Sequence, residues 1–408
     1  MKIIAAPDSF KGSLSSIQAA SAMEFGIKRA NPDLQVIKVP MADGGEGTVQ
    51  SLVNATGGKI IAVQVKGPLG DDIDAFYGLL GNGHTAVIEM AAASGLPLIA
   101  PGCRDPFKAT TYGTGQLIKN ALDHGCTEII VGLGGSATND GGAGMAQALG
   151  VHLLDSQGQE LPPGGGSLGL LDKIDLSNID ARIFNTKIIA ACDVLNPLCG
   201  PDGATYVYGP QKGVPHNSLK LLDQNLSHYG YVIERSLERE IANLPGAGAA
   251  GGLGAGIMAF LNARLEKGIN MVIRLTGLEQ KMADADLVIT GEGRLDYQTV
   301  FGKTPFGVAA TAKKYNLPVV AVAGSLGEGF ETLYAQGFDS IFAISDGPIT
   351  LEQSMDRCEE LLASASERIV RLWMTAFNSK SSGLQTRGSQ RSVHPDKPWW
   401  HNGDQHHL

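Results

Sequence analysis

Residues Glu128–Gly142 read EIIVGLGGSATNDGG, a short β-branched run followed at once by a glycine-rich loop. Small and polar residues after the loop open an expected helix. Glycines allow backbone N–H groups to approach an anion closely, and a helix N-terminus adds partial positive charge. Asn139 and Asp140, within the loop, offer oxygen ligands of the kind that Mg²⁺ prefers. A strand, a phosphate-type loop and a helix in this order indicate an α/β fold with a site for a nucleotide and a metal ion.

The same kind of loop occurs twice more in the chain. VIKVPMADGGEGT covers Val36–Thr48, and LVITGEGRLD covers Leu287–Asp296. In both regions strand-like runs alternate with helical patterns, which predicts a parallel sheet with helices on its faces. Ligands of such sheets bind at the carboxyl ends of the strands, so we expect these loops at the binding site.

The pattern changes in the middle of the chain, where short strands joined by Gly/Asp turns favour a mixed sheet. The length of 408 residues also exceeds the usual size of a single core. We therefore expect an α/β protein of two domains. Residues 1–58 and 284–378 form a parallel, Rossmann- or flavodoxin-like α/β/α domain, residues 59–283 form an inserted mixed α/β domain, and residues 379–408 form a disordered polar tail.

Composition excludes several classes of protein. The net charge of −9 offers no basic face, so no nucleic-acid partner is expected. The five cysteines include no CxxC pair, which is typical of reduced thiols in a cytoplasmic protein. Ile241–Ala263 carries no charge and is long enough to span a bilayer, but its many glycines give little affinity for lipid. We interpret it as a buried helix, and we expect no membrane contact.

Two of the loops carry charged residues that can be interpreted in two ways. Lys11 follows the first strand and can neutralise a phosphate, or it is simply a solvated lysine. Asp43 and Glu46 suit Mg²⁺ or a hydroxyl proton, or they cap the next helix as a capping box. A capping box does not need the diglycine Gly44-Gly45, which favours a functional loop.

Two nucleotide-binding patterns have to be weighed. Gly132–Ala137 matches the GxGxxA pattern of dinucleotide-binding loops, and Asp155 could bind a ribose hydroxyl, so an NAD-dependent oxidoreductase stays open. Against it, Asp140 would lie beside a pyrophosphate with no cation to offset its charge. A Walker A motif is not expected at Gly302-Lys303-Thr304, because Tyr297 stands where the first glycine should be.

Further charged residues follow two other strands. Asp193, in CDVLNP, could act as a base or a metal ligand, or it could close an Asx-turn. Lys212, in GPQKG, offers a second cation on a turn. Arg294 could clamp a carboxylate or phosphate, with Glu292 and Asp296 holding it in place or binding metal. The alternative for Arg294 is a local pair with aspartate that has no function.

Eight motifs occur in this order along the chain and together indicate a known family: APDSFKGSLSS, PMADGGEGT, IEMAAASGL, GLGGSATNDGGAGMAQALG, ACDVLNPL, GPQKG, PGAGAAGGLGAG and ITGEGRLD. From residue 1 to about 376 the chain resembles the bacterial glycerate kinases of the type-1 family. The resemblance implies ATP-dependent phosphorylation of D-glycerate with Mg²⁺, most often to 2-phosphoglycerate, with 3-phosphoglycerate as the alternative. It also implies two α/β domains with the active site in the cleft between them.

Phosphoryl transfer demands positioning and charge neutralisation more than covalent chemistry, and the candidate residues divide accordingly. We expect the triphosphate of ATP on Gly134, Gly135 and Ser136, with Asn139 beside it. Mg²⁺ is expected at Asp43, Glu46 or Asp140. Asp193 is the expected base, and Lys11 and Arg294 neutralise charge on the substrate or the transferring phosphoryl group. The residues expected to contact D-glycerate are Asp8, Ser9, Asp43, Gly44, Gly45 and Glu292.

Overall fold

The computed structural model describes residues 1–381, and one of its two main sheets has five strands, all parallel. Their order, β13-β12-β11-β1-β2, joins the first part of the chain to the last. The strands are β1 (Lys2–Pro7), β2 (Gln35–Lys38), β11 (Leu287–Leu295), β12 (Val319–Leu326) and β13 (Ser340–Ala343). The parallel sheet predicted for these stretches is therefore present.

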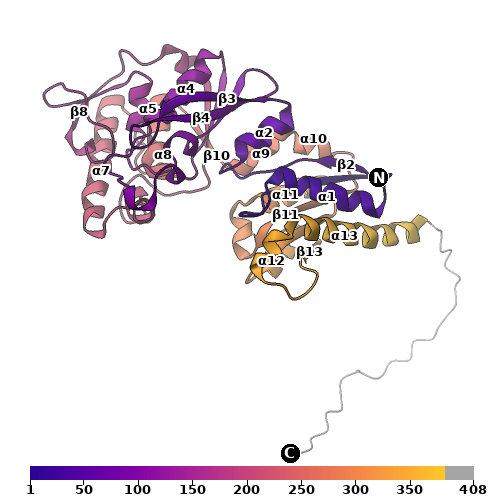
Figure 1. Ribbon diagram of the computed structural model, residues 1–408. Coiled ribbons are helices and arrows are strands. Elements are labelled where there is room, and N and C mark those ends of the chain that lie inside the picture. The colour runs from indigo at the N-terminus through magenta and orange to yellow at the C-terminus, as the bar shows by residue number, and fades with distance from the viewer. Residues whose placement is uncertain (382–408) are drawn as a thin grey trace, which may run out of the picture.

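Helices cover both faces of this sheet (Figure 1). Helices α1 (Ser16–Ala30) and α13 (Cys358–Ser381) pack against each other on one face, and α11 (Thr304–Lys313) packs on the other. Successive strand residues point to opposite faces, so Ile3 joins the core under α1 while Ile4 joins the core under α11. Because both faces are covered, the central strands β1, β11 and β12 begin with nearly continuous buried apolar runs rather than a strict alternation.

The second main sheet is mixed and has six strands in the order β10-β9-β6-β5-β4-β3. The strands β5, β6, β9 and β10 are parallel, whereas β3 and β4 form an antiparallel extension. Their bounds are β3 Lys59–Lys66, β4 Asp72–Leu79, β5 Thr85–Glu89, β6 Glu128–Gly132, β9 Lys187–Ala191 and β10 Arg264–Glu266. The mixed sheet expected for the middle of the chain is confirmed.

Helices of various lengths and one antiparallel strand pair surround this mixed sheet. They are α3 (Ala91–Ser94), α4 (Tyr112–Asp123), α5 (Ala143–Ala148), α6 (Ala204–Tyr208), α7 (Leu219–Leu237), α8 (Ala249–Leu261) and the pair β7 (His152–Asp155) and β8 (Leu171–Asp175). Helix α8 is buried, as predicted, and it enters through the left-handed residues Ala250–Gly252. At Gly251 a Cβ would lie 1.9 Å from the carbonyl oxygen of Thr138, so only glycine fits there. Within the described residues, no helix combines the length and the hydropathy that crossing a membrane requires.

Three helices connect the two sheets. Helix α2 (Thr48–Thr56) packs on β3, β4 and β5 of the mixed sheet and also on α9 (Gly268–Thr276). Helices α9 and α10 (Leu278–Met282) in turn contact α11, and Figure 1 shows α2, α9 and α10 between the two parts of the molecule. One apolar core therefore runs from the parallel sheet to the mixed sheet, through residues such as Ile269.

The C-terminal end of the described chain is helical. A short helix, α12 (Leu351–Asp356), precedes α13, and α13 continues to Ser381. The expected tail, residues 379–408, therefore begins inside this helix. Residues 382–408 lie outside the described residues.

Candidate active site

Carboxylates from distant parts of the chain line one cavity at the carboxyl ends of the parallel strands. Asp8 directly follows β1, Glu292 lies in β11, and Asp43 lies in the loop before α2. The cavity has a volume of about 480 Å³. It is lined by Asp8, Ser9, Phe10, Lys11, Ser13, Asp43, Glu292, Gly293, Arg294, Lys303, Gly324, Ser325, Ile344, Leu351, Ser354, Met355 and Cys358. We call it the parallel-sheet cavity.

A second cavity, of about 440 Å³, opens at the carboxyl ends of β6 and β9 in the mixed sheet. It is lined by Asp43, Gly44, Gly45, Leu96, Leu133, Gly134, Gly135, Ser136, Ala191, Cys192, Asp193, Val194, Tyr208, Gln211, Lys212, Ala249 and Ala250. We call it the glycine-loop cavity. Asp43 lines both cavities, so they adjoin at this residue.

Three carboxyls around Asp43 are harder to ionise than usual. Burial raises the pKa of Asp8 to about 6, and the charge of Asp43 adds to the effect. Burial likewise raises the pKa of Asp193 to about 6, again with a contribution from Asp43. Burial raises the pKa of Glu292 to about 7, although the nearby Lys303 partly offsets it. Crowded, desolvated carboxyls of this kind are typical of functional sites, where a bound cation favours their ionised form.

The start of α11 supplies a lysine and a hydroxyl to the parallel-sheet cavity. Thr304 Oγ1 donates a 2.5 Å hydrogen bond to Asp8 Oδ2. Lys303 Nζ lies 3.7 Å from Glu292 Oε1 and 3.6 Å from Asp296 Oδ1. Sequence reasoning missed this pair, because it tested Lys303-Thr304 only against the Walker A spacing.

Two predicted cations also line the parallel-sheet cavity. Lys11 is exposed on the loop after β1. The Arg294 side chain is 65% exposed, and its Nε lies 3.3 Å from Asp296 Oδ2. The local pair considered as an alternative for Arg294 is thus present, although most of the side-chain surface remains exposed.

Asp193 is held by a distant part of the chain. Its Oδ1 accepts a 3.1 Å hydrogen bond from the backbone N–H of Gly268, the first residue of α9. Gly268 itself is required by packing, since a Cβ there would lie 1.7 Å from the carbonyl oxygen of Asp43. A contact across 75 residues is not an Asx-turn. Gly268 binds Asp193 and packs against the backbone of Asp43, so it lies next to both residues.

A buried lysine lies beneath the glycine loop of the second cavity. Lys212 Nζ donates to Ser136 Oγ at 2.8 Å and to the carbonyl oxygen of Thr138 at 2.7 Å. Burial lowers the pKa of Lys212 to about 7, against a smaller opposing effect of Asp140. The sequence indicated a cation here but not that it is buried against Ser136.

Comparisons with known proteins show the family to which the chain belongs. The model of the glycerate kinase family matches residues 3–374. The chain belongs to the glycerate kinase family. It is 52% identical to a glycerate kinase of Bacillus subtilis over 380 residues, covering 92% of this chain and all of that protein. It is 49% identical to the glycerate 2-kinase of Escherichia coli over 369 residues, covering 90% and 97% of the two chains.

A solved structure shows the same fold in this family. The putative glycerate kinase 2 of Salmonella typhimurium LT2 superimposes with a TM-score of 0.85 at 48% identity, covering 93% of this chain and 99% of that chain. Membership of a kinase family makes ATP the expected phosphate donor. The GxGxxA pattern at Gly132–Ala137 is therefore not evidence for an NAD-dependent oxidoreductase in this glycerate kinase family member.

Within this family fold, Asp140 holds the glycine loop from behind. Its Oδ2 accepts from the Thr111 N–H at 2.7 Å, from Thr111 Oγ1 at 2.8 Å and from the Gly144 N–H at 3.3 Å. Its Oδ1 accepts from the Gly142 N–H at 3.2 Å. The side chain is completely buried and outside the residues that line the cavity, so we withdraw it as a metal ligand.

Asn139 and Glu46 also lie away from the two cavities. Asn139 is buried, and its Nδ2 donates to Thr205 Oγ1 at 2.9 Å. Glu46 is exposed and lines only a small side cavity of about 70 Å³ next to Asp8. Neither residue lines the two larger cavities, so their positions do not support the nucleotide and metal contacts predicted for them.

The capping box considered for α2 is absent in the described structure. Gly47 is the N-cap, with φ of 87° and no side-chain cap. Instead Glu89, at the end of β5, accepts from the Val49 N–H at 2.8 Å. Sequence reasoning missed Glu89 because this contact spans 40 residues.

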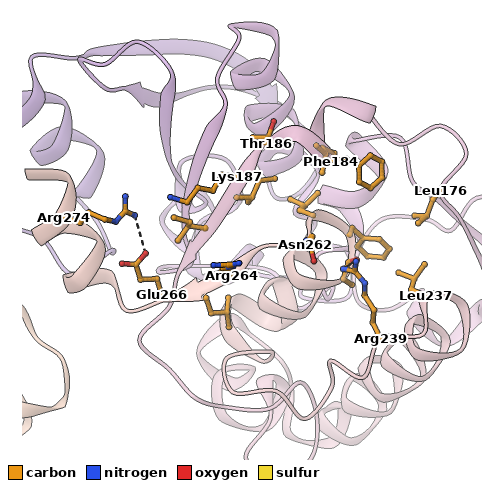
Figure 2. A pocket seen from close by; sticks show the side chains of 17 residues that line it. Leu176, Phe184, Thr186, Lys187, Leu237, Arg239, Asn262, Arg264, Glu266 and Arg274 are labelled. Carbon is orange, nitrogen blue, oxygen red and sulfur yellow. Dashed lines mark hydrogen bonds and ion pairs between the residues drawn. The ribbon is translucent and has the colours of Figure 1, made fainter.

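A larger cavity, of about 770 Å³, runs along the edge strand β10 and the first three residues of β9 (Figure 2). Arg274 lies 3.4 Å from Glu266 within this cavity, as Figure 2 shows, and Lys187 pairs at 2.7 Å with Glu128, which lies outside the lining. Since the carboxylate groups described above are not among its lining residues, we do not place the active site there.

Proposed function

We propose that the protein transfers the γ-phosphoryl group of ATP to the 2-hydroxyl of D-glycerate, giving 2-phosphoglycerate and ADP. The observation that carries the proposal is Asp43, which lines two cavities that each suit one substrate. The name of the Escherichia coli relative, glycerate 2-kinase, supports the choice of hydroxyl. We further propose that the two sheets form two domains, with the active site in the cleft between them.

We assign the role of general base to Asp193. A base must lie within hydrogen-bond reach of the hydroxyl and have a pKa near the operating pH. Asp193 lines the glycine-loop cavity beside Asp43, and burial brings its pKa to about 6. The Gly268 N–H binds one carboxylate oxygen, which leaves the other to accept the hydroxyl proton.

The carboxylates of the parallel-sheet cavity fit a magnesium ion. Asp8, Asp43 and Glu292 provide oxygen donors around one space, and the Thr304 hydroxyl lies next to Asp8. No group of three metal-ligating side chains is close enough for a complete protein site in the described chain. This suits Mg²⁺, which usually keeps several waters and binds through one or two carboxylates plus phosphates. When bound, the ion would neutralise charge on the transferring phosphoryl group.

Cysteine chemistry and net charge support a cytoplasmic location and a small-molecule substrate. The cysteines described by the structure are free thiols, which supports a reducing cytoplasm. The acidic chain gives no support to a nucleic-acid partner. We propose D-glycerate and ATP as the partners of the reaction.

A coupled assay for ADP release with D-glycerate and MgATP tests the reaction. We expect ADP release that depends on D-glycerate, and its absence would refute the proposed function. ³¹P NMR of the product distinguishes the two hydroxyls, and a signal from 3-phosphoglycerate would contradict the 2-kinase assignment. A thermal shift with NAD⁺ but not with MgATP would instead favour the oxidoreductase.

A further inference from the structure

We propose that the phosphates of ATP bind at Lys303 and Thr304, at the start of α11, and that D-glycerate occupies the glycine-loop cavity. This inference rests on the proposed function and reverses our expectation that the triphosphate binds Gly134–Ser136. It assigns the nucleotide to the parallel-sheet cavity, between the ends of β1, β11 and β12 and the helix α12.

Charge decides between the two cavities. Fully ionised ATP carries four negative charges, whereas glycerate carries one. The parallel-sheet cavity is lined by three cations, Lys11, Arg294 and Lys303, and by the carboxyls of Asp8, Asp43 and Glu292, whose charge a Mg²⁺ ion carried by ATP would offset. The glycine-loop cavity is lined by one cation, the buried Lys212, together with the carboxyls of Asp43 and Asp193. A single carboxylate suits one lysine, but a triphosphate does not.

The residues around Thr304 reproduce the chemistry of a phosphate-binding loop. In such loops a lysine reaches the phosphates, while the next hydroxyl shares Mg²⁺ with an aspartate at the end of an adjacent strand. Here Lys303 and Thr304 begin a helix that follows β11, and Asp8 ends the neighbouring strand β1. The 2.5 Å hydrogen bond from Thr304 to Asp8 joins the hydroxyl and the carboxylate.

The connection between β11 and α11 differs from a glycine-rich loop. A 3₁₀ turn at Tyr297–Phe301 replaces the glycines, and its N-terminus is capped by Asp296. Lys303 then adopts an extended backbone as the N-cap of α11, without a side-chain cap, and the first turn of α11 carries no acidic residue. The positive end of the helix therefore stays available to an anion.

An apolar wall at the other side of the same cavity suits the adenine ring. Phe10, Ile344, Leu351 and Met355 line it. Leu351 is 75% exposed, unusually for a leucine that lines a cavity, and a bound base would cover it. Glycerate has no ring or hydrocarbon chain that would use such a wall. The base then lies near α12, and the γ-phosphate lies toward Asp43 and the second cavity.

The first experiment measures nucleotide binding, not turnover. We expect Lys303→Ala to weaken the binding of the Mg²⁺ complex of AMP-PNP at least tenfold in isothermal titration calorimetry, because it removes a charge-assisted contact to phosphate. Lys314→Ala is the matched control: Lys314 follows the same helix, and its ion pair with Glu279 is exposed. D-glycerate affinity should stay within about twofold in both variants. Unchanged AMP-PNP affinity in Lys303→Ala would overturn the inference.

A second variant keeps the inference testable if Lys303→Ala folds poorly. Leu351→Ser alters an exposed residue, and we expect it to weaken AMP-PNP binding about threefold or more without changing the melting temperature. Photolabelling with 8-azido-ATP should modify Leu351–Asp356. Labelling of the residues that line the other cavity would place the base there and overturn the inference: Tyr208, Gln211, Lys212, Ala249 or Ala250.

These outcomes separate the inference from the function on which it rests. If the wild-type protein phosphorylates D-glycerate but Lys303→Ala binds AMP-PNP normally, the function stands and the nucleotide position is wrong. If the wild-type protein does not phosphorylate D-glycerate, the function fails even where Lys303→Ala loses nucleotide binding.

Discussion

Thr304 Oγ1 donates a hydrogen bond to Asp8 Oδ2, and this contact joins residues 296 positions apart in the sequence. It exists because β1 and β11 are parallel neighbours, which brings the loop after β1 next to the start of α11. The contact orders one side of the parallel-sheet cavity, while Asp43 connects that cavity to Asp193.

Replacing Asp193 with asparagine should abolish the base without disturbing the backbone contact. We expect kcat to fall by about 10²–10⁴, the usual contribution of general base catalysis, with an unchanged melting temperature. In the wild-type enzyme the carboxylate must be ionised, so kcat should rise with pH through about 6, following the raised pKa of Asp193. Turnover close to normal in Asp193→Asn, measured at pH 8, would remove Asp193 from this role.

Replacing Arg294 with lysine keeps the charge but loses the planar fork. Because Arg294 lines the parallel-sheet cavity, we expect a rise of about tenfold in KM for ATP and little change in KM for D-glycerate. Steady-state kinetics with each substrate varied in turn check this. Lys11→Arg, on the same cavity, serves as a comparison that keeps a cation. If Arg294→Lys leaves kcat and both KM values unchanged, Arg294 does not contact substrate.

The lowered pKa of Lys212 predicts a pH dependence of the free energy of unfolding. Its folded pKa of about 7 lies below its ordinary value of 10.5, so between these pH values the unfolded chain binds more protons. The free energy of unfolding should therefore rise with pH in this window, by up to about 1.4 kcal/mol per pH unit from this group. Urea unfolding of wild type and Lys212→Met at pH 6 to 9 measures the difference. A pH dependence identical in the two proteins would contradict the lowered pKa of the buried lysine.

Asp140→Asn should act on the fold rather than on metal binding. Asparagine keeps one acceptor oxygen but replaces the other with an NH₂ group. That donor would face the N–H and O–H donors of Thr111 or the N–H groups of the loop glycines, so those hydrogen bonds are lost. We expect a loss of roughly 2–3 kcal/mol in the free energy of unfolding, typical of a disrupted buried hydrogen-bond network. The Mg²⁺ concentration that gives half-maximal activity should be unchanged. A large increase in that concentration, with normal stability, would restore Asp140 as a metal ligand.

The fold could be predicted from the sequence to a considerable extent, because local patterns carry it. Apolar runs followed by glycine loops located β1, β6, β9 and β11, and the change of pattern indicated the mixed sheet. The packing of α2 could not be predicted in the same way. It depends on Glu89 at the end of another strand, and a helix that lacks its own cap shows no sequence signal for a distant partner.

The loops that form the candidate site could be predicted from the sequence. Which of their side chains face the cavities, and which loops are neighbours, could not. Polar residues in a glycine loop can face the cavity or the core, and nothing in GGSATNDGG distinguishes Ser136 from Asp140. The Thr304–Asp8 pair depends on strand order, which the sequence leaves open. A motif search at Lys303 failed because the contact depends on the neighbouring strand rather than on the spacing of glycines.

The single residue shared by two otherwise separate cavities has a stereochemical consequence. If ATP and D-glycerate occupy the two cavities together, the phosphoryl group passes directly between them at Asp43, in one in-line displacement. One displacement inverts the configuration at phosphorus, whereas transfer through a phosphorylated side chain would retain it. A γ-phosphate made chiral with oxygen isotopes should therefore emerge inverted in the product.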